Sequence, residues 1–136
     1  MKRWVLVALV AVVLCAVGWQ SWQWSARRLD AARSKFLEDA GQLLLALQQY
    51  KEFTGRYPEG QNVDIARALS GQGPEKVVIL MVRKLDRNSK GELVDPWGTP
   101  LAFYFGGNSV LIRSAGPNQI WEDGASVASD DLFRSN

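Results

Sequence analysis

The sequence predicts an α+β fold in which one long N-terminal helix packs on a small antiparallel β-sheet. A charge-free apolar run covers residues 4–24, and an amphipathic stretch follows it without a proline until Pro58. The second half contains short β-branched and aromatic runs separated by glycine-rich turns. The length of 136 residues suits one domain of ordinary size.

The composition excludes several function classes. There is no histidine, which removes His-based acid–base catalysis and most zinc sites. The one cysteine, Cys15, allows no intramolecular disulfide. The net charge of +2 is that of Lys2 and Arg3, so the rest of the chain is neutral and indicates no nucleic-acid partner. We therefore expect a protein that is not an enzyme.

The apolar run from Trp4 to Trp24 predicts a single membrane-spanning anchor over residues 1–24. As a helix it is about 31 Å long, which matches the hydrocarbon core of a bilayer. Tryptophans at both of its ends are typical of membrane interfaces. A cleaved signal peptide is the alternative, because Ala16-Val17-Gly18 is a usable cleavage site.

The orientation of this anchor is ambiguous. Four basic residues follow it, and their count favours a cytoplasmic C-terminal domain: Arg27, Arg28, Arg33 and Lys35. A short N-terminal segment with two basic residues is instead typical of an export signal, which would place the domain in the periplasm.

Residues 25–54 continue as an amphipathic helix. Apolar residues recur every seven positions, with two more on the same stripe: Leu29, Phe36, Leu43 and Tyr50, then Ala40 and Leu47. Gly55 and Pro58 end the pattern. One helix from residue 4 to about 53 is thus expected; two helices joined near residues 20–25, or a coiled-coil dimer, are the alternatives.

A short helix is expected at residues 63–69 and a small sheet within residues 77–113. The expected strands are 77–82, 101–105 and 109–113, the last two joined by a hairpin at Gly106-Gly107-Asn108. Asp95-Pro96 begins a turn. Trp97 beside it is expected to be buried against the helix near Leu43 and Leu47.

Residues 114–136 are expected to form a C-terminal loop rich in acidic residues: Glu122, Asp123, Asp130 and Asp131. Clustered oxygen ligands in an irregular loop suit a hard cation such as calcium. The alternative is a solvated acidic terminus. Adjacent carboxylates at 130 and 131 are poor candidates for a catalytic pair, because neighbouring side chains in a tail point apart.

The order of these motifs resembles the major pseudopilin of type II secretion systems, in the type IV pilin-like superfamily. The matching pieces are Leu44-x-x-Leu47-x-x-Tyr50, Gly55-x-Tyr57-Pro58, the segment from Leu93 to Pro100, Ser114-Ala115-Gly116-Pro117-Asn118 and Asp130-Asp131-Leu132. The resemblance implies a pilin-like lollipop, with residues 25–136 as its soluble domain. It also implies a single-pass protein of the bacterial inner membrane with this domain in the periplasm.

The resemblance further implies a calcium ion in the C-terminal loop. Its ligands would be the carbonyls of Ala115 and Ser129 and the side chains of Asn118, Asp130 and Asp131. The family usually has Asp where this chain has Asn118, so the affinity should be lower. Glu122 or Asp123 could supply the missing charge.

The resemblance implies a structural subunit that packs with copies of itself, with other pseudopilin-like subunits and with the secretion machinery. Family members carry a prepilin signal and a glutamate at the fifth mature position, whereas this chain has no acidic residue before Asp30. That difference favours an alternative, an anchored or exported periplasmic binding module that uses a pilin-like domain without assembling a filament.

Overall fold

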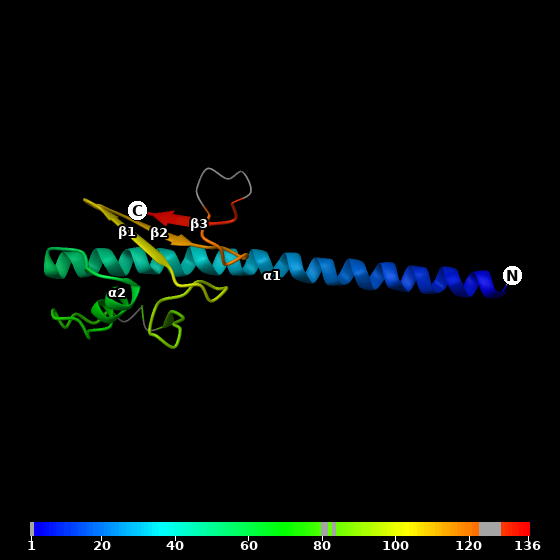
Figure 1. The fold of residues 1–136 in the computed structure, drawn as a ribbon, viewed down its shortest axis with the longest axis horizontal. Coiled ribbons are helices and arrows are strands. Elements are labelled where there is room, and N and C mark those ends of the chain that lie inside the picture. The colour runs from blue at the N-terminus through cyan, green and yellow to red at the C-terminus, as the bar shows by residue number, and fades with distance from the viewer. Residues whose placement is uncertain (1, 80–81, 83, 123–128) are drawn as a thin grey trace. The chain divides into compact units, whose positions relative to one another are not determined.

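The computed structural model describes residues 2–79, 82, 84–122 and 129–136 (Figure 1). Within the first helix, the side chains at positions 2–14, 16, 17 and 21 are outside this description. The elements in chain order are α1 (Lys2–Thr54), α2 (Asn62–Leu69), β1 (Ala102–Gly106), β2 (Ser109–Ser114) and β3 (Leu132–Ser135). The coarse α+β prediction is therefore confirmed.

The long helix α1 is continuous, so the alternative of two helices joined near residue 20 is wrong. It ends at Gly55, whose amide donates to the carbonyl of Lys51 at 2.7 Å. Gly55 has φ of +82°, the left-handed conformation that closes many helices. The predicted stop signal acts as expected.

The chain divides into two compact units, residues 1–32 and 33–136. In the first unit the described part is helical, and Cys15, Trp19, Trp22 and Trp24 are exposed. Most side chains of the expected membrane span at residues 4–24 lie outside the description. Among the residues that are described, none of the helices has the length and apolar character needed to cross a bilayer.

The second unit is built around residues 33–54 of α1. Every residue of the predicted stripe from position 36 onward is buried: Phe36, Ala40, Leu43, Leu47 and Tyr50. Leu29, which belongs to the first unit, is 42% exposed. The heptad spacing thus identified the core face of the helix from Phe36, but not before it.

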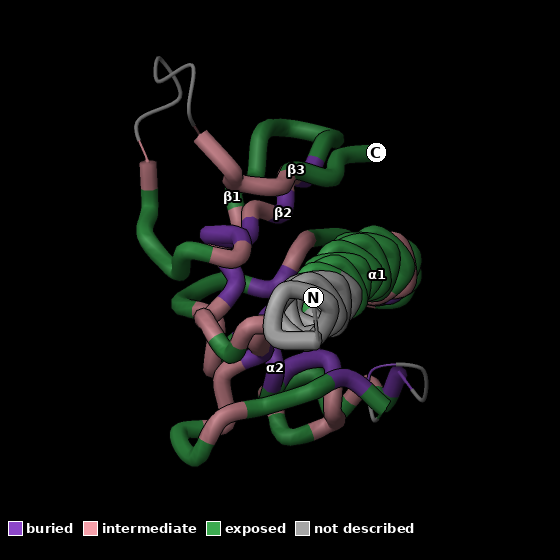
Figure 2. Tube along the Cα trace, turned by 90° about the vertical axis from the view of Figure 1, so that its right-hand side faces the viewer, coloured by how far each residue is buried: buried purple, intermediate pink, exposed green. Residues whose placement is uncertain are grey.

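The helix segment 33–54 has the sheet on one side and α2 on the other (Figure 1), and the buried stretches of chain lie on those two sides of it (Figure 2). The predicted short helix is confirmed as α2. At its N-terminus, the amide of Gln61 donates to Asp64 Oδ2 at 3.0 Å and the amide of Asp64 donates to the carbonyl of Gln61 at 2.9 Å, which satisfies amides that have no partner within the helix. Its inner face buries Ile65, Ala66, Ala68 and Leu69.

The sheet has the antiparallel order β1-β2-β3. Phe103 pairs with Ile112, and Ile112 with Arg134. Gly107 in the hairpin between β1 and β2 has φ of +57°, as the first position of a type II′ turn requires. Two of the predicted strands are confirmed, but residues 114–136 are not entirely loop, because β3 pairs with β2.

The predicted strand at residues 77–82 is wrong for the part that is described. Val78 forms one isolated bridge with Ser70, and the amide of Ile79 donates to the carbonyl of Leu69 at 2.9 Å. Ile79 and Val82 are nonetheless buried. Ile79 and Val82 are apolar because they cover the core, and the described sheet begins at β1, not at residue 77.

The prediction for Trp97 is also wrong. Its side chain is only partly buried and lies outside the core cluster of the described residues. The core in this region is made by Leu93 and Ile112, both fully buried. Asn62 ties the chain together there: its side chain donates to the carbonyls of Leu93 and Leu101 and accepts from the amide of Leu93.

Candidate metal centre in the C-terminal loop

A buried hydrogen-bond network fixes the end of β2. The Asp95 carboxylate accepts the amides of Trp97 and Thr99 through Oδ1, at 3.0 and 2.8 Å. Its Oδ2 accepts the Ser114 hydroxyl at 2.6 Å, and Ser114 Oγ accepts the amide of Gly116 at 3.0 Å. Asp95 and Ser114 are buried, so this network sets where the loop after β2 starts.

Gly116 lets this loop approach the C-terminal segment closely. Its φ is +70°, and a Cβ added there would lie 2.3 Å from the carbonyl oxygen of Asp130. No side chain fits in that space. Two segments that are distant in the sequence, residues 115–118 and 129–131, are therefore held in contact.

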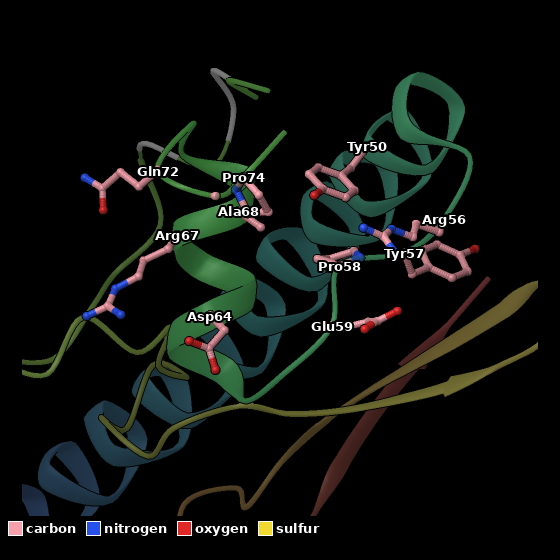
Figure 3. Close-up of a pocket in the computed structure, with 11 residues that line it drawn as sticks. Tyr50, Arg56, Tyr57, Pro58, Glu59, Asp64, Arg67, Ala68, Gln72 and Pro74 are labelled. Atoms are coloured by element: carbon pink, nitrogen blue, oxygen red, sulfur yellow. The ribbon is translucent and has the colours of Figure 1, made fainter. Parts of the chain in front are cut away.

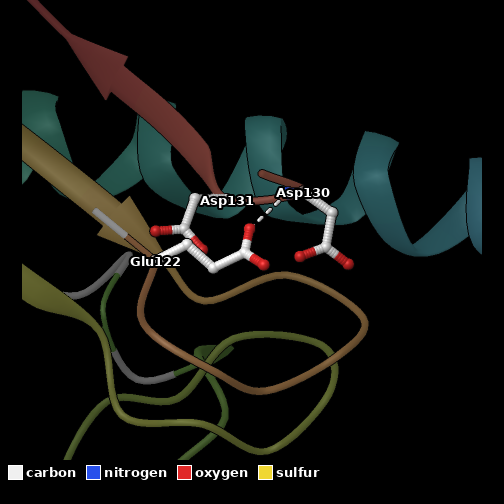
Figure 4. A group of neighbouring side chains, drawn as sticks. All are labelled: Glu122, Asp130 and Asp131. Carbon is white, nitrogen blue, oxygen red and sulfur yellow. Dashed lines mark hydrogen bonds between the residues drawn. The ribbon is translucent and has the colours of Figure 1, made fainter. Parts of the chain in front are cut away.

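Three carboxylates meet at this contact. Glu122, Asp130 and Asp131 each offer one oxygen, and these oxygens lie within 4.8 Å of one another. Figure 4 shows Glu122 reaching toward both aspartates, with its Oε2 accepting the amide of Asp130 at 3.0 Å. All three residues are partly shielded from solvent.

Asn118 supports this group from the side of the loop. Its amide N–H donates to Asp130 Oδ2, and its side-chain Nδ2 donates to Glu122 Oε1, both at 3.2 Å. The side-chain oxygen of Asn118 accepts the amide of Ile120 at 2.8 Å. In this arrangement Asn118 orients the carboxylates, while its own oxygen closes a local turn.

Two buried carboxylate oxygens have no hydrogen-bond partner among the described residues, Asp130 Oδ1 and Asp131 Oδ1. The Asp131 side chain has no solvent exposure at all. A buried anionic oxygen without a partner is costly, and three carboxylates so close together repel one another. Because calcium binds carboxylate and carbonyl oxygens in flexible geometry, the donor set fits this ion.

One positive charge offsets the group. Arg113 on β2 pairs with Asp131, donating from Nε to Oδ2 at 2.6 Å, and its Nη2 donates to the carbonyl of Glu122. The hydrogen bond to Asp131 raises the pKa of Arg113, so the guanidinium stays charged. Three carboxylates against one guanidinium leave a formal charge of −2.

The structure can be compared with the predicted ligand set. It brings Asp130 and Asp131 together and adds Glu122, one of the two residues considered for the missing charge. Asp123, the other, lies outside the described residues. Asn118 lies beside the carboxylates and donates hydrogen bonds to Asp130 and Glu122. Ala115 directly follows β2 and Ser129 directly precedes Asp130, and the role of their carbonyls as ligands stays a prediction.

Sequence reasoning missed Arg113. It stands opposite Phe133 in the register of β2 and β3, and Phe133 is two residues after Asp131 in the chain. Its role depends on that pairing, and β3 itself was not predicted. The sequence therefore carries no separate signal for Arg113.

Apart from the carboxylate group, the domain has a hollow where the end of α1 faces α2, with a volume of about 330 Å³ (Figure 3). Two of its charged groups are engaged in the fold: Arg56 pairs with Glu75 at 3.2 Å, and Asp64 accepts the amide of Gln61 at 3.0 Å at the start of α2. Burial raises the pKa of Tyr50 on its wall. Structural contacts therefore account for Arg56 and Asp64.

Comparison with known proteins identifies no relative: no protein-family model, no curated protein and no solved structure matches this chain.

Proposed function

We propose that this chain is a membrane-anchored, non-catalytic structural subunit, similar to the pseudopilins of type II secretion or a related pilus-like system. The observation that carries the proposal is the single helix α1. It includes the charge-free run of residues 4–24, and its residues 33–54 form the core of an α+β domain. The same helix would carry both the bilayer anchor and the central helix of the domain.

The membrane part of the proposal rests on the sequence of residues 4–24 and on the three tryptophans at its C-terminal end. Trp19, Trp22 and Trp24 are 67%, 70% and 63% exposed. Exposed indole rings at the end of an apolar run suit the interfacial zone of a bilayer. We place the protein in the bacterial inner membrane, with residues 25–136 in the periplasm.

The assembly part rests on the outward side of α1 in the domain. Leu45 and Phe53 are 57% and 76% exposed, while the opposite side is fully buried. In this proposal, Leu45 and Phe53 lie in the contact with another subunit. The expected partners are copies of this chain or other pilin-like subunits.

Calcium belongs to the same proposal, as an ion that ties the C-terminal segment to the end of β2. Asp130, Asp131 and Glu122 would hold it, and the partnerless oxygens of the two aspartates support this assignment. The ion would supply charge neutralisation and cross-linking of two loops, and no reaction step.

One experiment tests anchoring and assembly together. A photo-crosslinking amino acid replaces Leu45 in the full chain, and bacterial membranes are isolated and irradiated. We expect the protein in the membrane pellet after alkaline extraction, with crosslinked products of at least twice the chain mass. The same amino acid at Lys90, an exposed loop position, is the matched control and should give fewer products.

Two outcomes would contradict the proposal. A mature chain that begins at Trp19, seen by intact mass, would remove the anchor. A chain that stays in the membrane but gives no crosslinks from position 45 would favour the second candidate, a binding module that does not assemble. The lack of acidic residues before Asp30 is the observation that favours that candidate.

A further inference from the structure

The Arg113 guanidinium lies in a cradle formed by Trp121, Phe133, Asp131 and the carbonyl of Glu122, beside the three carboxylates. Its guanidinium lies 5.1 Å from the ring centroid of Trp121 and 5.4 Å from that of Phe133. Its side chain is only 17% exposed. The Arg113 guanidinium is therefore surrounded by two aromatic rings, a carboxylate and a backbone carbonyl. A surface ion pair gives a cation only one of these partners, the carboxylate.

Two residues, Asp131 and Glu122, both contact Arg113 and belong to the proposed metal centre. Asp131 gives Oδ2 to Arg113, while its Oδ1 has no partner among the described residues. Glu122 is shared as well: its carbonyl accepts from Arg113 and its carboxylate belongs to the acidic group. A divalent cation at the carboxylates would thus stand close to a fixed positive charge.

The Arg113 guanidinium and a bound divalent cation are both positive, so they would repel each other even when water screens them. A monovalent and a divalent cation about 5 Å apart repel enough, in a water-like medium, to change an affinity roughly tenfold. The guanidinium also neutralises part of the charge that would attract the metal. Both effects lower the affinity of the centre for a divalent cation.

We propose that Arg113 is a resident counter-cation that competes with calcium for Asp131, holding the C-terminal segment in place without metal and lowering the calcium affinity. This inference rests on the proposed calcium centre. Arg113 is a positioning residue, because it acts on the ion through Asp131. The segment would then have two alternative cations, one fixed in the chain and one supplied by the solution.

The test measures calcium binding to the full-length protein in detergent by isothermal titration calorimetry. We expect Arg113→Gln to bind calcium roughly tenfold more tightly than the unmodified chain. The matched control is Arg134→Gln, which removes the same charge from an exposed position on β3 and should leave the affinity within about twofold. In chelator, Arg113→Gln should melt at a lower temperature, and saturating calcium should restore most of the difference.

A purely structural role for Arg113 gives a different result. In that case Arg113→Gln would bind calcium equally or more weakly, because the ligands would be less well held. Calcium binding by the unmodified chain with unchanged or weaker binding by the variant overturns this inference and leaves the calcium centre standing. An absence of binding by both proteins up to about 10 mM overturns the calcium centre itself, and this inference with it.

A second measurement covers the case in which Arg113→Gln does not fold. The Nε–H of Arg113 in the unmodified protein donates to Asp131, so its NMR signal should be protected from exchange in chelator. Calcium should shift this signal and speed its exchange. A signal that stays the same at saturating calcium would overturn the proposal.

Discussion

Gly116 is the position where one added methyl group should do the most damage to the C-terminal loop. A Cβ there would lie 2.3 Å from the carbonyl oxygen of Asp130 and 2.9 Å from its carbonyl carbon. Both are backbone atoms, which cannot rotate away as a side chain can. Gly116→Ala should therefore separate the loop at 115–118 from the segment that carries Asp130 and Asp131.

The expected cost has two parts. A non-glycine residue at φ of +70° costs about 1–2 kcal/mol in the left-handed region. Forcing an extra methyl group against packed backbone costs about 1–3 kcal/mol more. Gly116→Ala should thus lower the free energy of unfolding by about 2–5 kcal/mol, a large share of the stability of a small domain.

Thermal melting of the full chain in detergent, followed by circular dichroism, measures this cost. Gly107→Ala is the matched control, because Gly107 has φ of +57° and nothing within 4 Å of an added Cβ. It should show the backbone cost alone, about 1–2 kcal/mol. If the two variants melt together, the close contact between Gly116 and Asp130 is not present in solution, and the geometry of the proposed centre is wrong.

Two further predictions use the same melting assay. Calcium at a hundred times its dissociation constant should stabilise the chain by about 2.7 kcal/mol. The double variant Asp130→Asn, Asp131→Asn should lose this response. An equal response in both proteins would contradict the site. Leu47→Ala should lower the free energy of unfolding by about 2–5 kcal/mol, because Leu47 is fully buried. Trp97→Ala should lower it clearly less, because Trp97 is partly exposed. The reverse order would contradict the observed core.

The helices and the hairpin could be predicted because their signals are local. The spacing of Phe36, Leu43 and Tyr50 marks the core face of α1, and Gly55 marks its end. Gly107 marks the turn between β1 and β2. In each case the residues that determine the element lie within a few positions of it.

The strand at 77–82 shows where local reasoning fails. A short apolar, β-branched run indicates burial, and burial was observed for Ile79 and Val82. Whether such a run joins a sheet depends on the partner that the rest of the chain supplies. Here the neighbour is the end of α2 at Leu69 and Ser70, which offers only a single bridge.

The sequence predicted only part of the candidate site, because the rest depends on contacts between segments that are distant in the chain. The acidic residues were visible in the sequence, and the family resemblance singled out Asp130 and Asp131. The contribution of Glu122 and the pairing of Arg113 both depend on the contact between β2 and β3. The alternation along β2 marks it as a strand, but this local pattern does not show that residues 132–135 pair with it.

The polar contacts around Asp131 matter because β3 has little apolar surface to bury. Leu132 is partly buried, while the rest of the strand is exposed, Phe133 at 48%. Hydrophobic burial therefore contributes little to holding this four-residue strand, and a chain terminus tends to fray unless it is fixed. The hydrogen bond from Val110 to Asn136 fixes its far end, and the bond from Arg113 to Asp131 fixes its beginning. In the proposal above, a calcium ion at the carboxylates would take over this second attachment from Arg113, at the point where the strand leaves the loop.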